Sequence, residues 1–205
     1  ALSDERAARR RQHDRTDALL RAQRRVLELV PAPVPLSEVL SAIAAAIESQ
    51  TDGVLCSIVL STPDGGRFTD GAAPSIGGRY LETLLTLPAA PPYLGPCARA
   101  VHGGEETLVT DIAGDDEWAP AWRTLALDHG LRACRSLPIR SETGQVIGTF
   151  AMYRREVGDP TPEDETLVAI AARLVAVAVE HRRANRELSE REASEHAQAL
   201  ALCDQ

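Results

Sequence analysis

The feature that most constrains this chain is a stretch over 162–202 with neither glycine nor proline after its first residue. Thr161 suits a helix N-cap, Pro162 suits the first turn, and the acidic residues that follow suit the positive end of the helix dipole. A helix of about forty residues is about 60 Å long, which exceeds one small domain. The half beyond Arg182 is therefore expected to pair with another helix, which we favour, or to stay solvated.

The segment 1–30 predicts a second connector helix, because it lacks glycine and proline and its later apolar residues recur at three- and four-residue steps. The proline-rich stretch 31–35 ends this helix, since proline lacks the backbone donor. Both terminal segments carry a thin apolar stripe of the kind that pairs helices. We therefore predict a parallel homodimer whose two-fold axis lies near Val26, Leu27 and Leu188.

The composition fits a soluble, cytoplasmic protein with one domain and extensions. The chain has 205 residues, of which 44% are hydrophobic and 25% are charged. No apolar run reaches the roughly 20 residues that span a bilayer, so we expect no membrane insertion. The net charge is −8, and the chain contains no lysine. An acidic surface repels phosphates, so binding to nucleic acid is not expected.

The four cysteines lie far apart, and no two of them form a CxxC pair. A structural zinc site needs clustered ligands, and a disulfide framework needs a secreted context. We therefore expect reduced thiols and no metal site. Cys97 is placed near the N-terminus of a short predicted helix, where the dipole would lower its pKa. We favour the interpretation of Cys97 as a packed thiol, and a redox role is the alternative.

The middle of the chain alternates short helices and strands, which predicts an α+β domain. Ser37 is expected to cap a helix that ends at Ile47. The expected strands are 54–60, 67–72, 107–112, 132–140 and 146–154, and the expected helices are 78–87, 97–102 and 120–129. Asp116 or Glu117 is expected to cap the last of these helices.

Five sequence runs in a fixed order resemble the motifs of the GAF domain family. They are GPCARAV at 95–101, GEETLVTDI at 104–112, GLRACRSLPI at 130–139, GQVIGTFAMY at 144–153 and PTPEDE at 160–165. The resemblance implies a GAF fold over about 36–184, between connector helices at 1–30 and 185–205. It also implies a central antiparallel sheet with the terminal helices on one face and a ligand pocket on the other.

The resemblance places the roof of that pocket between Gly77 and Gly130. The candidate pocket residues are Cys97, Trp118, Trp122, Cys134 and Met152. Trp118 and Trp122 are four residues apart, which would put them on one helical face. They line the pocket in one interpretation and cover the sheet in the other, which we favour.

The resemblance does not identify a ligand, because fold alone does not set function. GAF domains that bind cyclic nucleotides carry a lysine in their signature, and this chain has none. In bilin-binding members the attachment cysteine usually precedes histidine, a pair that Cys97 and Cys134 lack. Haem would need His102 or His129, which we interpret as helix-end residues instead. We therefore expect no cofactor and, at most, an unknown small-molecule ligand.

The enzymatic alternative is free methionine-(R)-sulfoxide reductase, a GAF protein that uses cysteine thiolates. Cys97 matches one of its pocket cysteines, but the stretch 118–130, which corresponds to its nucleophile segment, has no cysteine. We therefore expect a regulatory domain without a catalytic site of its own. A ligand-free dimerisation module is a further alternative.

The function expected from the resemblance is signal input to a covalently linked output domain. The chain begins at Ala1 rather than methionine, which is typical of a piece of a longer protein. GGDEF-type cyclic-di-GMP domains open with an apolar helix end, Asp, one residue and Leu-Thr-Gly-Leu, and this chain ends at Asp204-Gln205. We therefore predict a GGDEF-type output. A histidine kinase is the alternative, for which Glu195-His196 is a weak signal.

Overall fold

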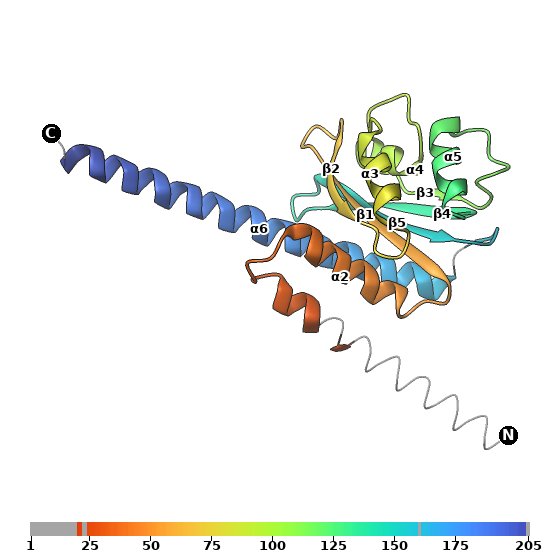
Figure 1. Ribbon diagram of the computed structural model, residues 1–205, viewed down its shortest axis with the longest axis horizontal. Coiled ribbons are helices and arrows are strands. Elements are labelled where there is room, and N and C mark those ends of the chain that lie inside the picture. The colour runs from red at the N-terminus through yellow and green to blue at the C-terminus, as the bar shows by residue number, and fades with distance from the viewer. Residues whose placement is uncertain (1–19, 22–23, 160, 204–205) are drawn as a thin grey trace, which may run out of the picture.

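The computed structural model describes residues 20–21, 24–159 and 161–203 (Figure 1). Residues 24–29 are helical. The remaining helices are α2 (Leu36–Glu48), α3 (Gly78–Thr86), α4 (Pro96–Ala98), the π-helix η1 (Arg99–Gly103), α5 (Pro120–Asp128) and α6 (Pro162–Cys203). The strands are β1 (Val54–Ser61), β2 (Phe68–Ala72), β3 (Thr107–Val109), β4 (Ala133–Arg140) and β5 (Val146–Arg154).

The five strands form one antiparallel sheet in the order β2-β1-β5-β4-β3, which confirms the predicted α+β class. Figure 1 shows α2 and α6 on one face of the sheet and α3, α4 and α5 on the other. We call these the helix face and the roof face. Because neighbouring side chains of a strand point to opposite faces, the sheet supports two separate cores.

Met152 corrects one predicted pocket residue. On β5, Phe150 and Met152 pack into the helix-face core, whereas Ala151 and Tyr153 pack into the roof-face core. The two-residue period of the strand therefore puts Met152 on the side opposite to the predicted pocket.

Several predicted helix ends shift in the structure. Pro35, not Ser37, precedes the first residue of α2, and no side chain caps that helix. The helix expected at 97–102 is a three-residue α-turn followed by η1. The residue before α5 is Ala119, so neither Asp116 nor Glu117 caps it; Asp116 instead pairs with Arg123. The third strand ends at Val109 instead of Ile112.

The start of α6 agrees with the predicted cap at Thr161. The Asp164 amide donates to Thr161 Oγ1 over 3.2 Å, and the Thr161 amide donates to Asp164 Oδ2 over 3.1 Å. This reciprocal pair is a capping box. Arg154 of β5 also pairs with the Asp164 carboxylate. Burial acts to raise the pKa of Asp164, but the bonds from Thr161 and Arg154 outweigh it and hold the pKa below its usual value.

This lowered pKa predicts a specific loss of stability in acid. A carboxylate with a depressed pKa in the folded state stabilises the protein above its unfolded-state pKa of about 3.9, and that contribution is lost as pH falls through the folded pKa. We expect Asp164→Asn to lower the urea midpoint at pH 7 and to weaken its fall between about pH 5 and pH 3. Equal pH slopes for the two proteins would contradict this assignment.

The segment before α2 is held by Arg182 of α6, whose guanidinium donates to Ala32 O over 2.7 Å and to Leu29 O over 3.4 Å. Val26 is 1% exposed and belongs to the helix-face core, so it does not face a partner as predicted. Leu27 and Leu188 are 62% and 57% exposed, as a contact between copies requires. The part of the predicted helix at 1–19 lies outside the described residues.

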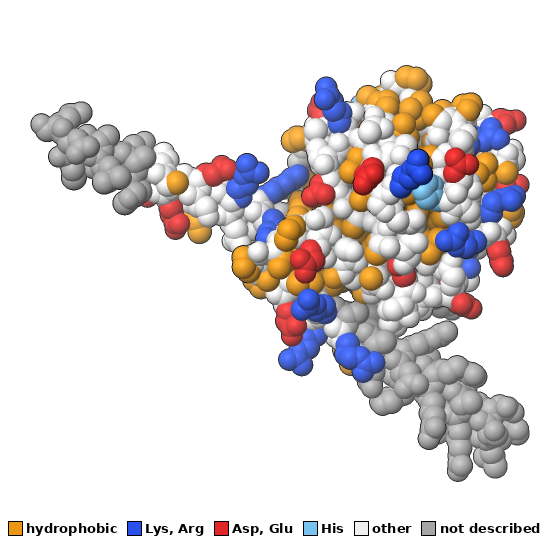
Figure 2. Space-filling view, viewed as in Figure 1, with side chains coloured by type: hydrophobic (Ala, Val, Ile, Leu, Met, Phe, Trp, Pro, Cys, Tyr) orange, Lys and Arg blue, Asp and Glu red, His pale blue; other side chains and the backbone are white. Residues whose placement is uncertain are grey.

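Beyond Arg182, α6 runs away from the domain (Figure 1), and its side chains from 183 to 195 are exposed. Figure 2 shows charged side chains of both signs along this part, with isolated hydrophobic ones between them. Among the described residues, no helix has the length and apolar character needed to cross a bilayer.

Candidate ligand site beneath the roof

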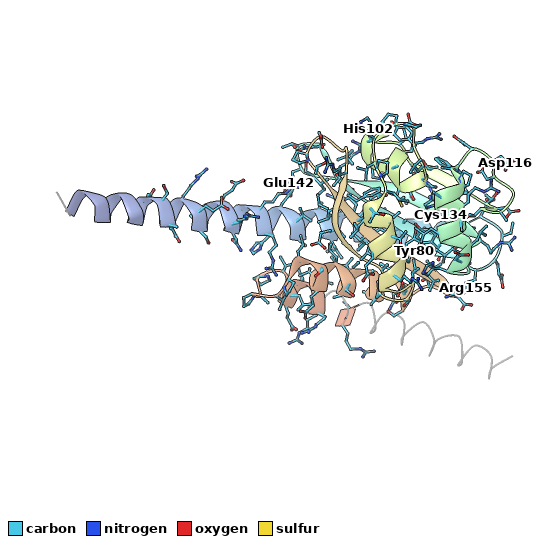
Figure 3. All side chains as sticks on the ribbon, turned by 45° about the horizontal axis from the view of Figure 1, so that its top comes forward. Tyr80, His102, Asp116, Cys134, Glu142 and Arg155 are labelled. Atoms are coloured by element: carbon cyan, nitrogen blue, oxygen red, sulfur yellow. The ribbon has the colours of Figure 1, made fainter. Side chains whose placement is uncertain are left out.

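The roof-face core contains a buried group of hydroxyl and thiol side chains. The Tyr80 and Tyr153 hydroxyls are 2.7 Å apart, and Cys97 Sγ lies 3.6 Å from the Tyr153 hydroxyl. Ser136 Oγ lies 3.5 Å from Cys97 Sγ and 3.6 Å from Cys134 Sγ. Tyr80 and Cys134, which are labelled in Figure 3, are both buried in the roof-face core. We call these five residues, together with Ser57 and Thr107, the hydroxyl–thiol cluster.

The floor of the cluster is a row of small side chains across four strands. The strand register aligns Ser57 of β1, Ala151 of β5, Ser136 of β4 and Thr107 of β3. All four are buried, and neither Ser57 Oγ nor Thr107 Oγ1 has a hydrogen-bond partner. Buried hydroxyls without partners are uncommon and costly, so this row retains capacity for hydrogen bonds.

The cluster is uncharged. Burial raises the pKa of both thiols, Cys97 and Cys134, and of both phenols, Tyr80 and Tyr153, so all four stay protonated near neutral pH. The raised pKa of Cys97 contradicts the prediction that a helix dipole would lower it. The reason is that α4 has only three residues and the Cys97 thiol is buried. Within the described residues, the one buried side chain with a formal charge is Asp164, on the helix face.

The charged residues of the roof lie on its outer surface. Arg99 pairs with Glu117 and stacks over the Trp118 ring, with 4.6 Å between its guanidinium carbon and the ring centroid. Arg123 pairs with Asp116, which Figure 3 shows at the outer edge of the roof. These ion pairs hold the roof loops together and engage both guanidinium groups.

The two tryptophans close the roof together, but they do not share a helix. Trp118 precedes α5 and donates from Nε1 to Asp115 Oδ2 over 3.2 Å, whereas Trp122 lies within α5. Their rings meet edge to face with centroids 6.3 Å apart. Trp122 Nε1 is buried and has no hydrogen-bond partner among the described residues. The indole lies close enough to Tyr80 to act to lower the pKa of that phenol, but burial raises the pKa by more.

The space under the roof is almost filled. A cavity of about 10 Å³ lies between Phe68, Leu84, Cys97 and Trp122, which is room for about one water molecule. Gly95 lies against the indole, and a Cβ there would be 2.6 Å from Trp122 Cγ. A ligand larger than a water molecule can therefore bind there only if the roof moves.

Comparison with known proteins identifies this architecture. Residues 34–180 match the sequence profile of the GAF domain family. The chain belongs to the GAF domain family. It is also 30% identical over 181 residues to the methyl sulfide methyltransferase-associated sensor of Methanosarcina acetivorans. That match covers 88% of this chain and 18% of the relative, so the chain spans less than a fifth of it.

Solved structures show the same fold at lower identity. The GAF domain of a phosphoenolpyruvate-protein phosphotransferase from Coxiella burnetii is 16% identical with a TM-score of 0.61, over 82% of this chain and 96% of that one. A domain from Sinorhizobium meliloti, described as part of a two-component sensor histidine kinase, is 19% identical with a TM-score of 0.58, over 76% and 98%. The structure of fRMsr of Staphylococcus aureus in its reduced form is 14% identical with a TM-score of 0.51, over 78% and 94%.

The structure brings four of the five predicted pocket residues into the roof-face core of this GAF domain, namely Cys97, Trp118, Trp122 and Cys134. Sequence reasoning missed Tyr80, Tyr153, Ser57, Ser136 and Thr107. The serines carried a usable signal, because Ser57 and Ser136 lie inside predicted strands, where each side chain faces one layer of the sheet. Their alignment into a row depends on strand register, which was not predicted.

The two candidate haem ligands of the GAF domain already have partners. His102 Nδ1 lies 3.2 Å from the exposed hydroxyl of Tyr93, and Figure 3 shows His102 at the top of the roof. His129 Nδ1 lies 2.9 Å from Leu125 O, at the end of α5, as the helix-end interpretation requires. In the part of the chain that the structure describes, no three histidine, cysteine or acidic side chains are grouped to hold a metal ion.

Proposed function

We propose that this GAF domain is a sensory input module that takes a small uncharged ligand at the hydroxyl–thiol cluster. The observation that carries the proposal is the row of buried hydroxyls, two of which have no hydrogen-bond partner. The thiols and phenols of the cluster are neutral and none of its seven residues is basic, so burying an anionic ligand among them costs far more than burying a neutral polar molecule. The name of the Methanosarcina relative, a sensor, supports the sensory role.

Ligand release tests this proposal. We expect mass spectrometry of material extracted from freshly purified, denatured protein to find an uncharged compound in near-stoichiometric amount. The double variant Ser57→Ala, Thr107→Val removes the unpartnered hydroxyls without adding volume to the packed site, and we expect it to carry much less of that compound. The matched control is Thr143→Val in the exposed β4–β5 turn. Equal loading of the double variant and the wild type would contradict the assignment of the site.

The ligand-free alternative has one observation in its favour, the small volume of the cavity under the roof. If extraction yields no compound from the wild type, the domain acts as a dimerisation module. In both cases we propose a parallel homodimer through the exposed face of α6. The exposed residues Ile170, Val177 and Leu188 follow the seven- and eleven-residue steps of a coiled-coil stripe.

The output domain remains a proposal. None of the relatives described above names a cyclic-di-GMP domain, whereas the Sinorhizobium structure comes from a protein described as a histidine kinase. We therefore keep both outputs, and the gene sequence beyond Gln205 separates them. Leu-Thr-Gly-Leu after Gln205 supports the GGDEF-type domain, and its absence rejects it.

We also propose that this domain has no catalytic activity of its own. The fRMsr structure shares the fold, and the nucleophile segment identified from the resemblance has no cysteine here. Both roof-face thiols are buried and protonated, which removes the thiolate that sulfoxide reduction requires. NADPH-coupled reduction of free methionine sulfoxide above the no-enzyme background would contradict this.

A further inference from the structure

We propose that two arginine links, made by Arg135 on the helix face of β4 and by Arg140 at the β4–β5 hairpin, couple the roof to α6. This rests on the proposed function, because it names how the state of the roof reaches the signalling helix. The sheet separates the roof from α6 (Figure 1), so coupling must pass through the strands or around their ends. Both links start from the segment 104–106, through which the chain leaves η1 and enters β3.

The first link is Arg135 on β4. Its two neighbours, Cys134 and Ser136, point into the hydroxyl–thiol cluster, so its own side chain points to the helix face. There the guanidinium pairs with Glu106, just before β3, and with Glu165 in the first turns of α6. The Arg135 side chain is 16% exposed, whereas the Glu106 and Glu165 side chains are 44% and 45% exposed, so only the arginine end of this double ion pair is shielded from solvent. One residue thus contacts the roof exit and the start of the helix.

The second link runs through the β4–β5 hairpin. Arg140 donates from Nη2 to Gly104 O over 2.8 Å and from Nη1 to Gly144 O over 3.1 Å. In the same turn the Glu142 amide donates to Glu180 Oε1 of α6 over 2.8 Å. Figure 3 shows Glu142 at the end of the domain from which α6 emerges. The hairpin therefore contacts the roof exit on one side and α6 on the other.

The backbone conformation of Gly104 allows its close contact with Arg140. Its φ of +67° lies in the left-handed region, which favours glycine, and a Cβ there would be 3.1 Å from Arg140 Nη2. The roof exit can therefore turn sharply and keep its carbonyl against the arginine. A change in η1 alters the position of that carbonyl directly.

The two links hold both ends of the domain-bound part of α6. Glu165 and Glu180 are fifteen residues apart, or about 22 Å along a helix. Beyond them, from Arg183, the helix is exposed. A displacement of 104–106 thus acts on α6 at two separated points, which shifts the direction of the helix as a whole. By thermodynamic linkage, releasing α6 from these points must also loosen the roof.

That reciprocity gives a test that needs no ligand. In the full chain, the double variant Glu165→Ala, Glu180→Ala removes the α6 end of both links at exposed or half-exposed helix positions. We expect labelling of Cys97 and Cys134 by N-ethylmaleimide, followed by peptide mass spectrometry, to become about three- to tenfold faster. The matched control is Glu190→Ala, which breaks an exposed Arg186–Glu190 pair on the same helix and should leave both rates unchanged.

Cys56 provides the internal control, because it is buried in the helix-face core and reports general unfolding. Its labelling rate should rise less than those of Cys97 and Cys134 in every variant that removes a link. Arg140→Gln removes the second link from the sheet side and should raise Cys97 labelling more than Cys56 labelling. Unchanged Cys97 labelling in both variants overturns the proposal, as does an equal rise at Cys56. Neither result depends on whether the cluster holds a ligand, so the proposed function is judged separately.

Discussion

Trp122→Ala is expected to lower the free energy of unfolding by about 3–5 kcal/mol. The side chain is almost wholly buried and touches Gly95, Trp118 and the small cavity beside Cys97. The neighbouring side chains are held in a close-packed core, so they can refill only part of the space that the indole leaves. Since small domains are stable by only about 5–15 kcal/mol, one substitution removes a large share of the total.

Urea denaturation followed by far-UV circular dichroism measures this effect without relying on tryptophan fluorescence. The control is Leu108→Ala on β3, where the side chain is exposed and the expected change is within about 0.5 kcal/mol. A loss below about 1 kcal/mol for Trp122→Ala would mean that the roof is not packed as the structure shows.

Leu188→Glu is expected to weaken the proposed homodimer by about a hundredfold or more. Leu188 lies on the exposed stripe of α6, beyond the part that the domain covers. Near a two-fold axis each leucine would be buried against its partner, at about 1.5 kcal/mol or more per copy, and a buried glutamate pair adds repulsion. The sum of about 3 kcal/mol corresponds to that change in the dissociation constant.

Light scattering and sedimentation over a range of protein concentrations measure this change. Ala193→Glu is the matched control, because it adds the same charge on the same exposed helix at a position off the stripe. A wild-type chain that is monomeric at micromolar concentration would reject the dimer itself. Equal weakening by both variants would show that charge, and not the stripe, controls association.

The comparison of sequence and structure is clearest on β5. Alternation identified 146–154 as a strand, and the strand is there with the same bounds. The alternation of side chains along the strand did not tell which of them face the roof, and Met152, which faces the helices, was assigned to the pocket side. The face depends on which layer covers each side of the sheet, and that choice is made by residues distant in sequence.

Val26 shows the same limit for helices. A thin apolar stripe predicts that something covers it, and the spacing of Val26 and Leu27 was equally compatible with a partner chain and with the same chain. The structure packs Val26 into its own helix-face core and leaves Leu27 exposed, because the proline-rich turn and Arg182 bring the segment back against α6.

The sequence by itself determined the local features of this protein: the approximate positions of most helices and strands, the GAF domain motifs, the cap of α6 at Thr161 and Asp164, and the length of a helix that no single domain covers. These depend on residues within a few positions of each other, whose backbone preferences and hydrogen bonds are local. Only the tertiary structure decided the row of Ser57, Ser136 and Thr107, the raised pKa of Cys97 and the arginine links to α6. Those depend on strand register and on burial between layers, which join residues far apart in the chain.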